Sequence, residues 1–390
     1  MKARKKNILL IPSWYPGKAD PVKGLFIKKH AIEIARLNHV EVIYFEFIKD
    51  KGIENNTIVQ NESSDIDLTE TIFPVVLSTN PFRMVLSFIK MNWIVWRYIR
   101  KSEFHFDIIH LHVIYPTGVF LFPVIWLNSL PMVITEHWSG YFHQDGRYFS
   151  LSSVFRKMIK RIFSKSNAVT VVSEPLGKRI ADEFGIGEKI HLISNVISLP
   201  NELLTQNRNV GPVTALTVCT FDDHAKNITG MIKAVKEIVQ LRPDFRLVIA
   251  GDGPDKQKIL EEIARNQISS KNIILTGYIN EDEIVKWRNK ADFYLLNSFF
   301  ETFSIGTAEA LLSGLPVIST RCQGPETYIT EKEGILIEPG NQEKLVDALL
   351  KMIDSCRNYN PSEIRNAVRN RLRLDDISES FDKLYDSIMN

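Results

Sequence analysis

The sequence predicts an α/β protein of two domains, each a parallel β-sheet covered by helices on both faces. Two observations carry this prediction. Short apolar runs alternate along the chain with stretches of helical periodicity, which is typical of parallel strands buried on both faces. The series stops at a polar segment near the middle of the 390 residues and then restarts. The composition, 44% hydrophobic and 24% charged, lets each half bury its own core.

In the first half, five apolar runs are predicted strands, and a helix is predicted between the first two. The strands are expected at 8–11, 40–45, 108–112, 132–135 and 168–172, and the helix at 23–37. Residues 49–71 are polar and acidic, and we predict a loop or an irregular excursion there. Residues 199–212 are polar and contain Pro200, Gly211 and Pro212, so they are the predicted linker.

The second half repeats the pattern. Strands are expected at 213–219, 246–250, 273–276, 293–296 and 316–320, and helices at 227–241, 255–266, 281–289, 307–313 and 343–354. The predicted domains are 1–200 and 205–370, and a last helix at about 372–390 is expected to pack back on the first domain. Ligands of open parallel sheets bind outside the carboxyl ends of the strands. We therefore expect the active site in a cleft between the two sheets.

Composition also restricts the partners and the compartment. The net charge of +2 gives no support for nucleic-acid binding. The three cysteines are far apart and lack metal-ligand spacing, which argues against a disulfide framework or a zinc site and favours a reducing compartment. No run of 18 uncharged apolar residues occurs. We expect a cytoplasmic protein that can associate peripherally with the cytoplasmic face of a membrane.

Residues 297–320 carry the most informative pattern, NSFFETFSIGTAEALLSGLPVIST. Glu301 follows a predicted strand, and Glu309 lies eight residues later inside a helix that begins near 304–307. Unpaired N–H groups at a helix start attract phosphate, and carboxylates accept hydrogen bonds from sugar hydroxyls. These residues predict a nucleotide-sugar site. A capping Glu301 and a solvated Glu309 remain the alternative.

Three further segments place polar groups after predicted strands. Gly251 and Gly253, in GDGP, let backbone approach a ligand closely, although a tight turn is equally consistent. Lys226 precedes a helix and could reach a diphosphate, although an exposed lysine is common there. His137, in TEHWSGY, would face the cleft from the first domain, or would be a structural histidine.

The order of many segments gives a more specific signal. They read IPSWYPGKADPVKGLFIKKHA, DIIHLHVIYPTG, TEHWSG, AVTVVSEPL, HLISNVI, AKNITGMIKAV, VIAGDGP, ILTGYI, ADFYLLNS, FETFSIGTAEALLSGLPVIST and EGILIEPGN. Over nearly its whole length the chain thereby resembles glycosyltransferase family 4. Members of that family have the GT-B fold, two Rossmann-like domains facing each other across a cleft.

The resemblance implies a role for each matched residue. Glu301 would hold hydroxyls of the donor sugar, Glu309 the ribose, Lys226 the diphosphate, and His137 would lie near the transferred sugar. The remaining matched residues would line the nucleotide-sugar site: backbone N–H groups of Phe303, Ser304 and Ile305 at the diphosphate, Gly251 and Gly253 at the nucleotide, Tyr278 near the base, and Gly24 close to donor or acceptor.

Three positions depart from the family pattern. The usual arginine five residues before the motif lysine is Phe221, so diphosphate charge would fall to Lys226, backbone donors, His224 or Arg321. Both glycines of the usual Glu-Gly-Phe-Gly are replaced, by Thr302 and Ser304. The usual Asn-Gly after the sixth strand is 195–196, Asn-Val.

The resemblance implies transfer of a sugar from a UDP- or GDP-sugar to a glycan or lipid-linked acceptor, with retention of configuration, in cell-surface polysaccharide or glycolipid synthesis. No cofactor or bound metal is expected, because the one Asp-x-Asp pattern, at 65–67, lies in the polar excursion. A sugar-nucleotide epimerase on the same fold and an inactive nucleotide-sugar-binding subunit remain alternatives. A dehydrogenase is excluded because no GxGxxG follows the first strand.

Two stretches, 80–102 and 154–166, are basic and amphipathic. In the first, Arg83, Lys90 and Arg97 lie seven residues apart, and no acidic residue occurs. Both stretches suit an anionic membrane surface. In the alternative, their apolar stripes pack on the sheet and their charges are solvated.

Overall fold

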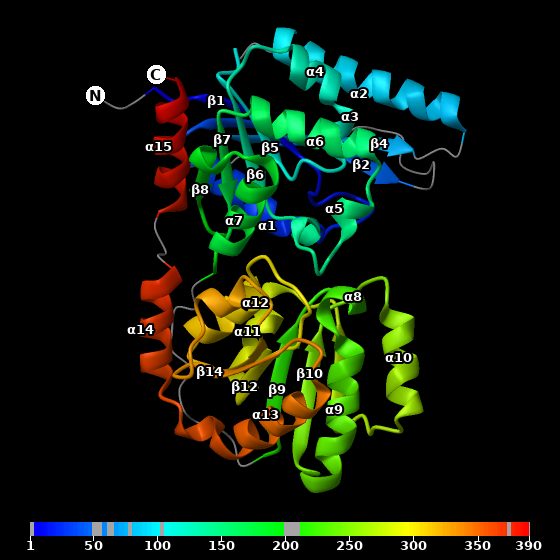
Figure 1. Ribbon diagram of the computed structural model, residues 1–390, viewed down its shortest axis with the longest axis vertical. Coiled ribbons are helices and arrows are strands. Elements are labelled where there is room, and N and C mark those ends of the chain that lie inside the picture. Colours follow the sequence, from blue (N-terminus) through cyan, green and yellow to red (C-terminus); the bar gives the residue numbers. More distant parts are fainter. Residues whose placement is uncertain are drawn as a thin grey trace. The chain divides into compact units, whose positions relative to one another are not determined.

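The computed structural model describes residues 4–48, 57–60, 66–76, 80–101, 105–198, 211–372 and 376–389. Most of the predicted linker, 199–210, lies outside these residues. The chain divides into two compact units (Figure 1). The first unit comprises Met1–Val196 and Asp375–Asn390, and the second comprises Ile197–Leu374.

The first unit is built on a sheet in the order β3-β4-β2-β1-β5-β6-β7-β8, in which only β3 runs antiparallel to its neighbour among the described residues. The strands are β1 Asn7–Pro12, β2 His39–Ile48, β3 Thr57–Gln60, β4 Leu68–Val76, β5 Ile108–His112, β6 Met132–Glu136, β7 Ala168–Val171 and β8 Ile190–Leu192. Strands β1 and β5–β7 are mainly apolar and almost entirely buried, as expected for parallel strands that are covered on both faces.

Helices cover this sheet (Figure 1). They are α1 Leu25–Ala35, α2 Pro81–Lys101, α3 Thr117–Phe120, α4 Phe122–Leu127, α5 Arg147–Ser150, α6 Ser153–Lys165, α7 Glu174–Phe184 and α15 Ile377–Met389. Helix α15 packs against α1. It places Phe381 and Tyr385 in the core, and its Asp382 and Asp386 bind Lys6 Nζ at 2.7 and 2.8 Å.

The prediction for residues 49–71 is partly wrong. Strand β4 begins at Leu68 and runs parallel to β2, and β3 pairs with its other edge. The acidic Glu70 misled the prediction, because acidic residues usually mark a loop. Here its buried carboxylate accepts a hydrogen bond from Tyr15 Oη at 2.5 Å and pairs with Lys28 Nζ at 3.0 Å, and this partnership makes its burial in a strand possible.

The second unit has a fully parallel sheet in the order β11-β10-β9-β12-β13-β14. Its strands are β9 Val213–Val218, β10 Phe245–Ala250, β11 Ile273–Gly277, β12 Phe293–Leu296, β13 Val317–Thr320 and β14 Gly334–Ile337, and its helices are α8 Asp223–Lys226, α9 Ile228–Leu241, α10 Lys256–Arg265, α11 Glu281–Lys290, α12 Ile305–Leu312, α13 Gln342–Ser355 and α14 Pro361–Leu372. All ten predicted elements are present, whereas β14, α8 and α14 were not predicted. The predicted fold class, two helix-covered parallel sheets, is confirmed.

The strand order of the second unit fixes where a ligand can bind. From β9 the chain continues to β10 on one side, whereas from β12 it continues to β13 on the other. Right-handed crossovers therefore place α9 and α12 on opposite faces, and a crevice opens at the carboxyl ends of β9 and β12. The first unit reverses in the same way between β1 and β5.

Candidate functional site

In the second unit, the loops that follow β9 and β12 meet at this reversal point. Backbone N–H of Phe299 donates to the carbonyl of Ala225 at 2.8 Å, and the Asn297 side chain donates to the carbonyl of Asn227 at 3.2 Å. Asn227 has a left-handed backbone, with φ of 48°. Asparagine is one of the few residues other than glycine that adopt this conformation readily. These bonds bring together Lys226, at the end of α8, and Glu301.

Lys226 and Glu301 form a largely buried ion pair. Lys226 Nζ donates to Glu301 Oε1 at 2.5 Å, and Ser298 Oγ donates to the same oxygen at 3.0 Å. Burial by itself would lower the pKa of Lys226, but the Glu301 carboxylate outweighs it and the pKa is raised. Lys226 is therefore a fixed positive charge at the carboxyl end of β9.

Helix α12 begins directly beside this pair. Ser304 precedes it with a left-handed φ of 63° and makes no side-chain cap. Tyr328 Oη donates to the carbonyls of Phe303 and Ser304 at 2.6 and 3.1 Å. Within the described residues, the N–H groups of Phe303, Ser304 and Ile305 have no recorded acceptor. Such a helix start binds anions such as phosphate, although this chain lacks both family glycines.

Glu309 lies one turn into α12 and is buried. Its Oε2 accepts a hydrogen bond from Arg288 Nη2 of α11 at 2.6 Å, and Arg288 is itself buried. A solvated helix glutamate is therefore excluded. Sequence reasoning missed Arg288, because α11 is rich in charged residues and nothing in its sequence distinguishes the one arginine that turns inwards.

Gly251 and Gly253 serve backbone packing. A Cβ at Gly251, where φ is 146°, would lie 1.9 Å from the Cys219 carbonyl oxygen, and one at Gly253 would lie 2.6 Å from the Phe221 nitrogen. The loops after β9 and β10 thus lie in direct contact. Phe221 is fully buried in the core of this unit, so nothing at the position of the missing arginine can face a phosphate.

The remaining predicted residues of the second unit lie nearer the surface. Tyr278 follows β11 and is 58% exposed, which leaves its ring available for stacking. His224 is exposed and contacts the ring of Phe300, and Arg321 lies 3.5 Å from Glu338. Neither contact prevents these two side chains from approaching an anion.

In the first unit, His137 follows β6 and belongs to a buried group of histidine rings. Its ring centroid lies 5.3 Å from that of His30 and 5.8 Å from that of His112, and Phe26 covers it at 4.8 Å. Both ring nitrogens of His112 lack a hydrogen-bond partner among the described residues. Three imidazoles with spare hydrogen-bonding capacity therefore lie near the reversal point of this sheet.

These rings are neutral at physiological pH. Burial lowers the pKa of His30 to about 4 and that of His137 well below its usual value. Repulsion from His30 and His110, when those rings are protonated, lowers the pKa of His137 further. The Asn195 side chain is near enough to oppose part of this shift but makes no direct hydrogen bond to the ring. Neutral imidazoles suit uncharged hydroxyl partners.

Glu136, next to His137, was not predicted to matter. Burial raises its pKa to about 7, and hydrogen bonds from Ile114 N–H and Tyr141 Oη offset part of that shift. Its Oε1 holds the loop after β5, and its Oε2 has no partner among the described residues. The motif TEHWSG contained this carboxylate, but only the fold shows that it is buried.

The same three histidines are the one group among the described residues that could hold a metal ion. Their candidate ligand atoms all lie within 4.8 Å of one another. Two nitrogens bound to one zinc at about 2.0–2.1 Å can be no more than about 4.2 Å apart. The rings would therefore have to move together to bind zinc if they span that full distance.

Gly24 lies immediately before α1 with a left-handed φ of 69°. A Cβ there would lie 2.6 Å from the Trp14 carbonyl group. The glycine lets the loop after β1 cross the start of α1, and its backbone stays near the carboxyl end of β1.

The two basic amphipathic stretches differ. In α2 the apolar stripe is exposed, including Phe82, Ile89 and Trp93. In α6 the stripe is buried through Ile159, Ile162 and Phe163. For 154–166 the structure favours the alternative, because most of the apolar stripe belongs to the core, although Val154 is 57% exposed. No described helix is long and apolar enough to cross a bilayer; residue 102 lies outside the described residues.

Comparison with known proteins identifies the family. The family model for glycosyl transferases group 1 matches residues 205–371, and that for Glycosyltransferase Family 4 matches residues 30–200. The two matches together span most of the chain. The chain belongs to glycosyltransferase family 4. This family 4 protein is accordingly a transferase.

Individual relatives agree with this assignment. The family 4 enzyme is 23% identical over 338 residues to 2-deoxystreptamine N-acetyl-D-glucosaminyltransferase of Niallia circulans, covering 79% of this chain and 86% of the relative. It is 26% identical over 316 residues to alpha-monoglucosyldiacylglycerol synthase of Acholeplasma laidlawii, covering 75% and 76%. The structure of sucrose-phosphate synthase from Thermosynechococcus elongatus matches with a TM-score of 0.77 at 15% identity, covering 98% and 99%. The fold is GT-B.

Proposed function

We propose that this family 4 enzyme transfers a sugar from a UDP- or GDP-sugar to a glycan or lipid-linked acceptor, with retention of configuration and without a metal, in cell-surface polysaccharide or glycolipid synthesis. One observation carries the proposal. Lys226, Glu301 and the open N–H groups at the start of α12 converge on the reversal point of one sheet. A fixed cation and helix N–H groups suit a diphosphate, and a carboxylate beside them suits sugar hydroxyls.

In the proposed reaction, each of these groups meets a different part of the donor. Lys226 and the N–H groups of Phe303, Ser304 and Ile305 stabilise negative charge that develops on the leaving diphosphate. The acceptor oxygen bonds to the anomeric carbon on the face from which the diphosphate leaves, and its proton passes to the departing phosphate. Because protein donors neutralise the leaving group, no metal is required. Activity should accordingly survive EDTA, and complete loss that magnesium restores would contradict this.

The carboxylates and the histidines hold the sugars. Glu301 orients hydroxyls of the transferred sugar beside the diphosphate, and His137 offers a neutral ring to sugar hydroxyls. Glu309, fixed by Arg288, accepts from ribose hydroxyls. Glu309→Ala should therefore weaken the binding of the donor and of the free nucleotide to a similar extent. Unchanged nucleotide affinity would refute the ribose contact.

An inactive nucleotide-sugar-binding subunit is the second candidate, because buried Phe221 replaces the family arginine. Two measurements separate the candidates. A thermal-shift screen of nucleotide sugars identifies the donor, since a ligand at 100 times its Kd adds about 2.7 kcal/mol of stability. Slow hydrolysis of that donor then shows a competent transferase, whereas binding without hydrolysis or transfer supports the inactive subunit.

We also propose that the enzyme works in the cytoplasm, at an anionic membrane surface. The exposed stripe of α2 and its arginines and lysines support surface binding, and the three cysteines are free. The relative from Acholeplasma laidlawii is named for a glucosyldiacylglycerol, a lipid product. Binding to anionic vesicles should fall steeply with salt. The triple variant Arg83→Glu/Lys90→Glu/Arg97→Glu should abolish it while leaving donor affinity intact.

A further inference from the structure

The side of α2 that faces away from the sheet exposes an unusual amount of apolar surface. Phe82 is 70% exposed and Trp93 is 52% exposed, and Leu127 of the neighbouring α4 is 83% exposed. Other members of this patch are Met84, Val85, Leu86, Ile89, Trp96 and Trp126. Single exposed apolar side chains are ordinary, but contiguous patches with a polar rim mark binding surfaces.

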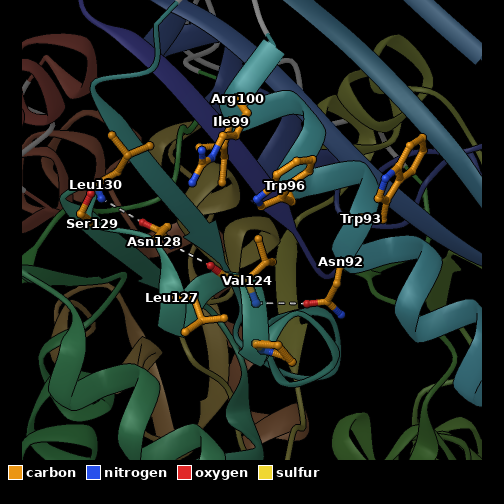
Figure 2. Close-up of a pocket in the computed structure, with 11 residues that line it drawn as sticks. Asn92, Trp93, Trp96, Ile99, Arg100, Val124, Leu127, Asn128, Ser129 and Leu130 are labelled. Carbon is orange, nitrogen blue, oxygen red and sulfur yellow. Dashed lines mark hydrogen bonds between the residues drawn. The ribbon is translucent and has the colours of Figure 1, made fainter.

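This patch contains a groove between α2 and α4. The groove has a volume of about 580 Å³ and is lined mainly by Trp93, Trp96, Ile99, Val124, Leu127 and Leu130. Figure 2 shows side chains of α2 and of α4 around the same opening. The volume falls within the roughly 300–1,000 Å³ typical of small-molecule sites. The groove is thus large enough for a small ligand or one lipid chain within the exposed patch.

The two amide side chains that line the groove are already hydrogen-bonded. Asn92 donates to the carbonyls of Phe88 and Phe120 and accepts from Val124 N–H at 3.2 Å. Asn128 donates to carbonyls of α4 and accepts from Leu130 N–H at 2.9 Å. Arg100 is the one charged residue among the described lining residues, and its guanidinium lies 5.6 Å from the Trp96 ring centroid. A ligand would therefore meet mainly apolar side chains in the groove, together with the Ser129 hydroxyl and one cation.

The charge around the groove has one sign. Residues 80–101 contain five arginines and lysines and no acidic residue, and α4 contains no charged residue. Arg97 repeats the pairing of Arg100, with its guanidinium 5.4 Å from the Trp93 centroid. An arginine that lies over a tryptophan ring places an anion-binding group directly beside apolar surface. This combination matches a lipid that has a negative phosphate and a hydrocarbon chain.

We propose that the groove between α2 and α4 binds one hydrocarbon chain of an anionic membrane lipid, with the lipid phosphate at Arg100. This inference deepens the membrane part of the proposed function and rests on it. Basic residues alone would attract the bilayer without selecting a lipid. The groove would bind one lipid specifically, because the hydrocarbon chain fills it and the phosphate binds Arg100. Helix α6 cannot do the same, since its apolar stripe is already buried.

The test uses the full chain, first with a short-chain lipid dissolved as monomers and then with vesicles. Dihexanoyl phosphatidylglycerol, kept below its micellar concentration, is titrated while tryptophan fluorescence is recorded, and dihexanoyl phosphatidylcholine is the zwitterionic comparison. Vesicles of phosphatidylglycerol with brominated chains then report tryptophan contact by quenching. Leu127→Glu places a carboxylate at the mouth of the groove, on a side chain exposed enough to leave folding unaffected. Leu241→Glu, at a residue 67% exposed in the second unit, is the matched control.

We expect saturable binding of the monomeric anionic lipid, weakened about tenfold or more in Leu127→Glu and unchanged in Leu241→Glu. Arg100→Gln should remove the preference for phosphatidylglycerol over phosphatidylcholine, whereas Arg357→Gln, an exposed arginine of the second unit, should not. Quenching by brominated lipid should disappear in the variant Trp93→Phe/Trp96→Phe/Trp126→Phe, which removes every tryptophan of the exposed patch.

The outcomes separate this inference from the proposed function. If vesicles bind but monomeric lipid does not, the groove proposal is overturned and surface binding stands. If neither binds, both membrane proposals fail, while donor hydrolysis still tests the transferase reaction. If lipid binds as expected and donor hydrolysis is absent, the groove is supported and the proposed reaction fails.

Discussion

The polar side chains at the carboxyl ends of the two sheets differ in charge and in hydrogen bonding. In the second unit, the charged side chains are already paired, Lys226 with Glu301 and Arg288 with Glu309. In the first unit, His30, His112 and His137 are buried, neutral and short of hydrogen-bond partners. One end keeps fixed charges available, and the other keeps uncharged donors and acceptors available.

This difference indicates which ligand groups each end can accept. A paired Lys226 retains its charge despite burial, because Glu301 supports it, and an arriving diphosphate adds to an existing electrostatic arrangement. Neutral imidazoles cannot hold an anion in the same way, but they satisfy hydroxyls at little electrostatic cost. The following predictions test this contrast, from the largest expected effect to the smallest.

Removing one partner of a buried pair should have the largest effect. Arg288→Ala takes away the cation that neutralises Glu309, and breaking a buried pair in this way lowers the free energy of unfolding by about 3–5 kcal/mol. Urea denaturation measures the change. The double variant Arg288→Leu/Glu309→Leu should recover most of the loss. If Arg288→Ala is as stable as the parent, Glu309 does not depend on this arginine.

The second prediction concerns the ligand contact of the other pair. Lys226→Ala should weaken binding of the nucleoside diphosphate by about 1.5–3 kcal/mol, roughly 10- to 150-fold, because a charge-assisted contact is lost. Binding of the nucleoside should hardly change. Calorimetry with both ligands measures the difference, and Lys256→Ala, at a half-exposed lysine in α10, is the control. Equal losses for both ligands would remove Lys226 from the phosphate site.

The third prediction tests the neutral end through pH. Above about pH 6.5 the His112 ring is neutral in both the folded and the unfolded chain. Below that pH the unfolded chain binds a proton that the buried ring refuses, so stability is lost as pH falls, by about 1.4 kcal/mol per pH unit for each such ring. His112→Gln should reduce the slope by that amount.

The control for this measurement is the parent chain at each pH, because Glu136 acts with the opposite sign. Its pKa is raised from 4.5 to about 7, so the folded chain gains stability as pH falls through that range. The comparison of parent and variant cancels this contribution. A slope that is the same in both chains would show that His112 is not held neutral.

The smallest effect is expected at Tyr278. Its ring is mostly exposed, so Tyr278→Ala should change the free energy of unfolding by no more than about 0.5 kcal/mol. Loss of stacking on the base should weaken binding of the free nucleoside by about 0.5–1.5 kcal/mol. Calorimetry with the nucleoside measures this, and unchanged affinity would place the base elsewhere. The profile would be the reverse of that expected for Lys226→Ala.

Sequence pattern predicted the strands with continuous apolar runs and the helices with clear periodicity, because those patterns are consequences of burial. It failed at β4, where Glu70 is paired with residues distant in sequence. At α6 it left two alternatives open, because periodicity could not say what covers the apolar side. It also missed Arg288 and Glu136. Their importance depends on which charged or polar groups are buried together, and this depends on strand order rather than on local spacing.

Helix α15 has a consequence for how the protein is made. Its residues follow the whole second unit in the chain, yet Phe381 and Tyr385 complete the core of the first unit, where Tyr385 Oη bonds to His110 at 2.7 Å. Chains emerge from the ribosome with the N-terminus first, and domains generally fold in that order. In this protein the second unit can finish folding before the first, because the first unit still lacks its last helix when the second has been synthesised. The nascent first unit therefore leaves the α15 docking surface open, against α1, throughout synthesis of the second.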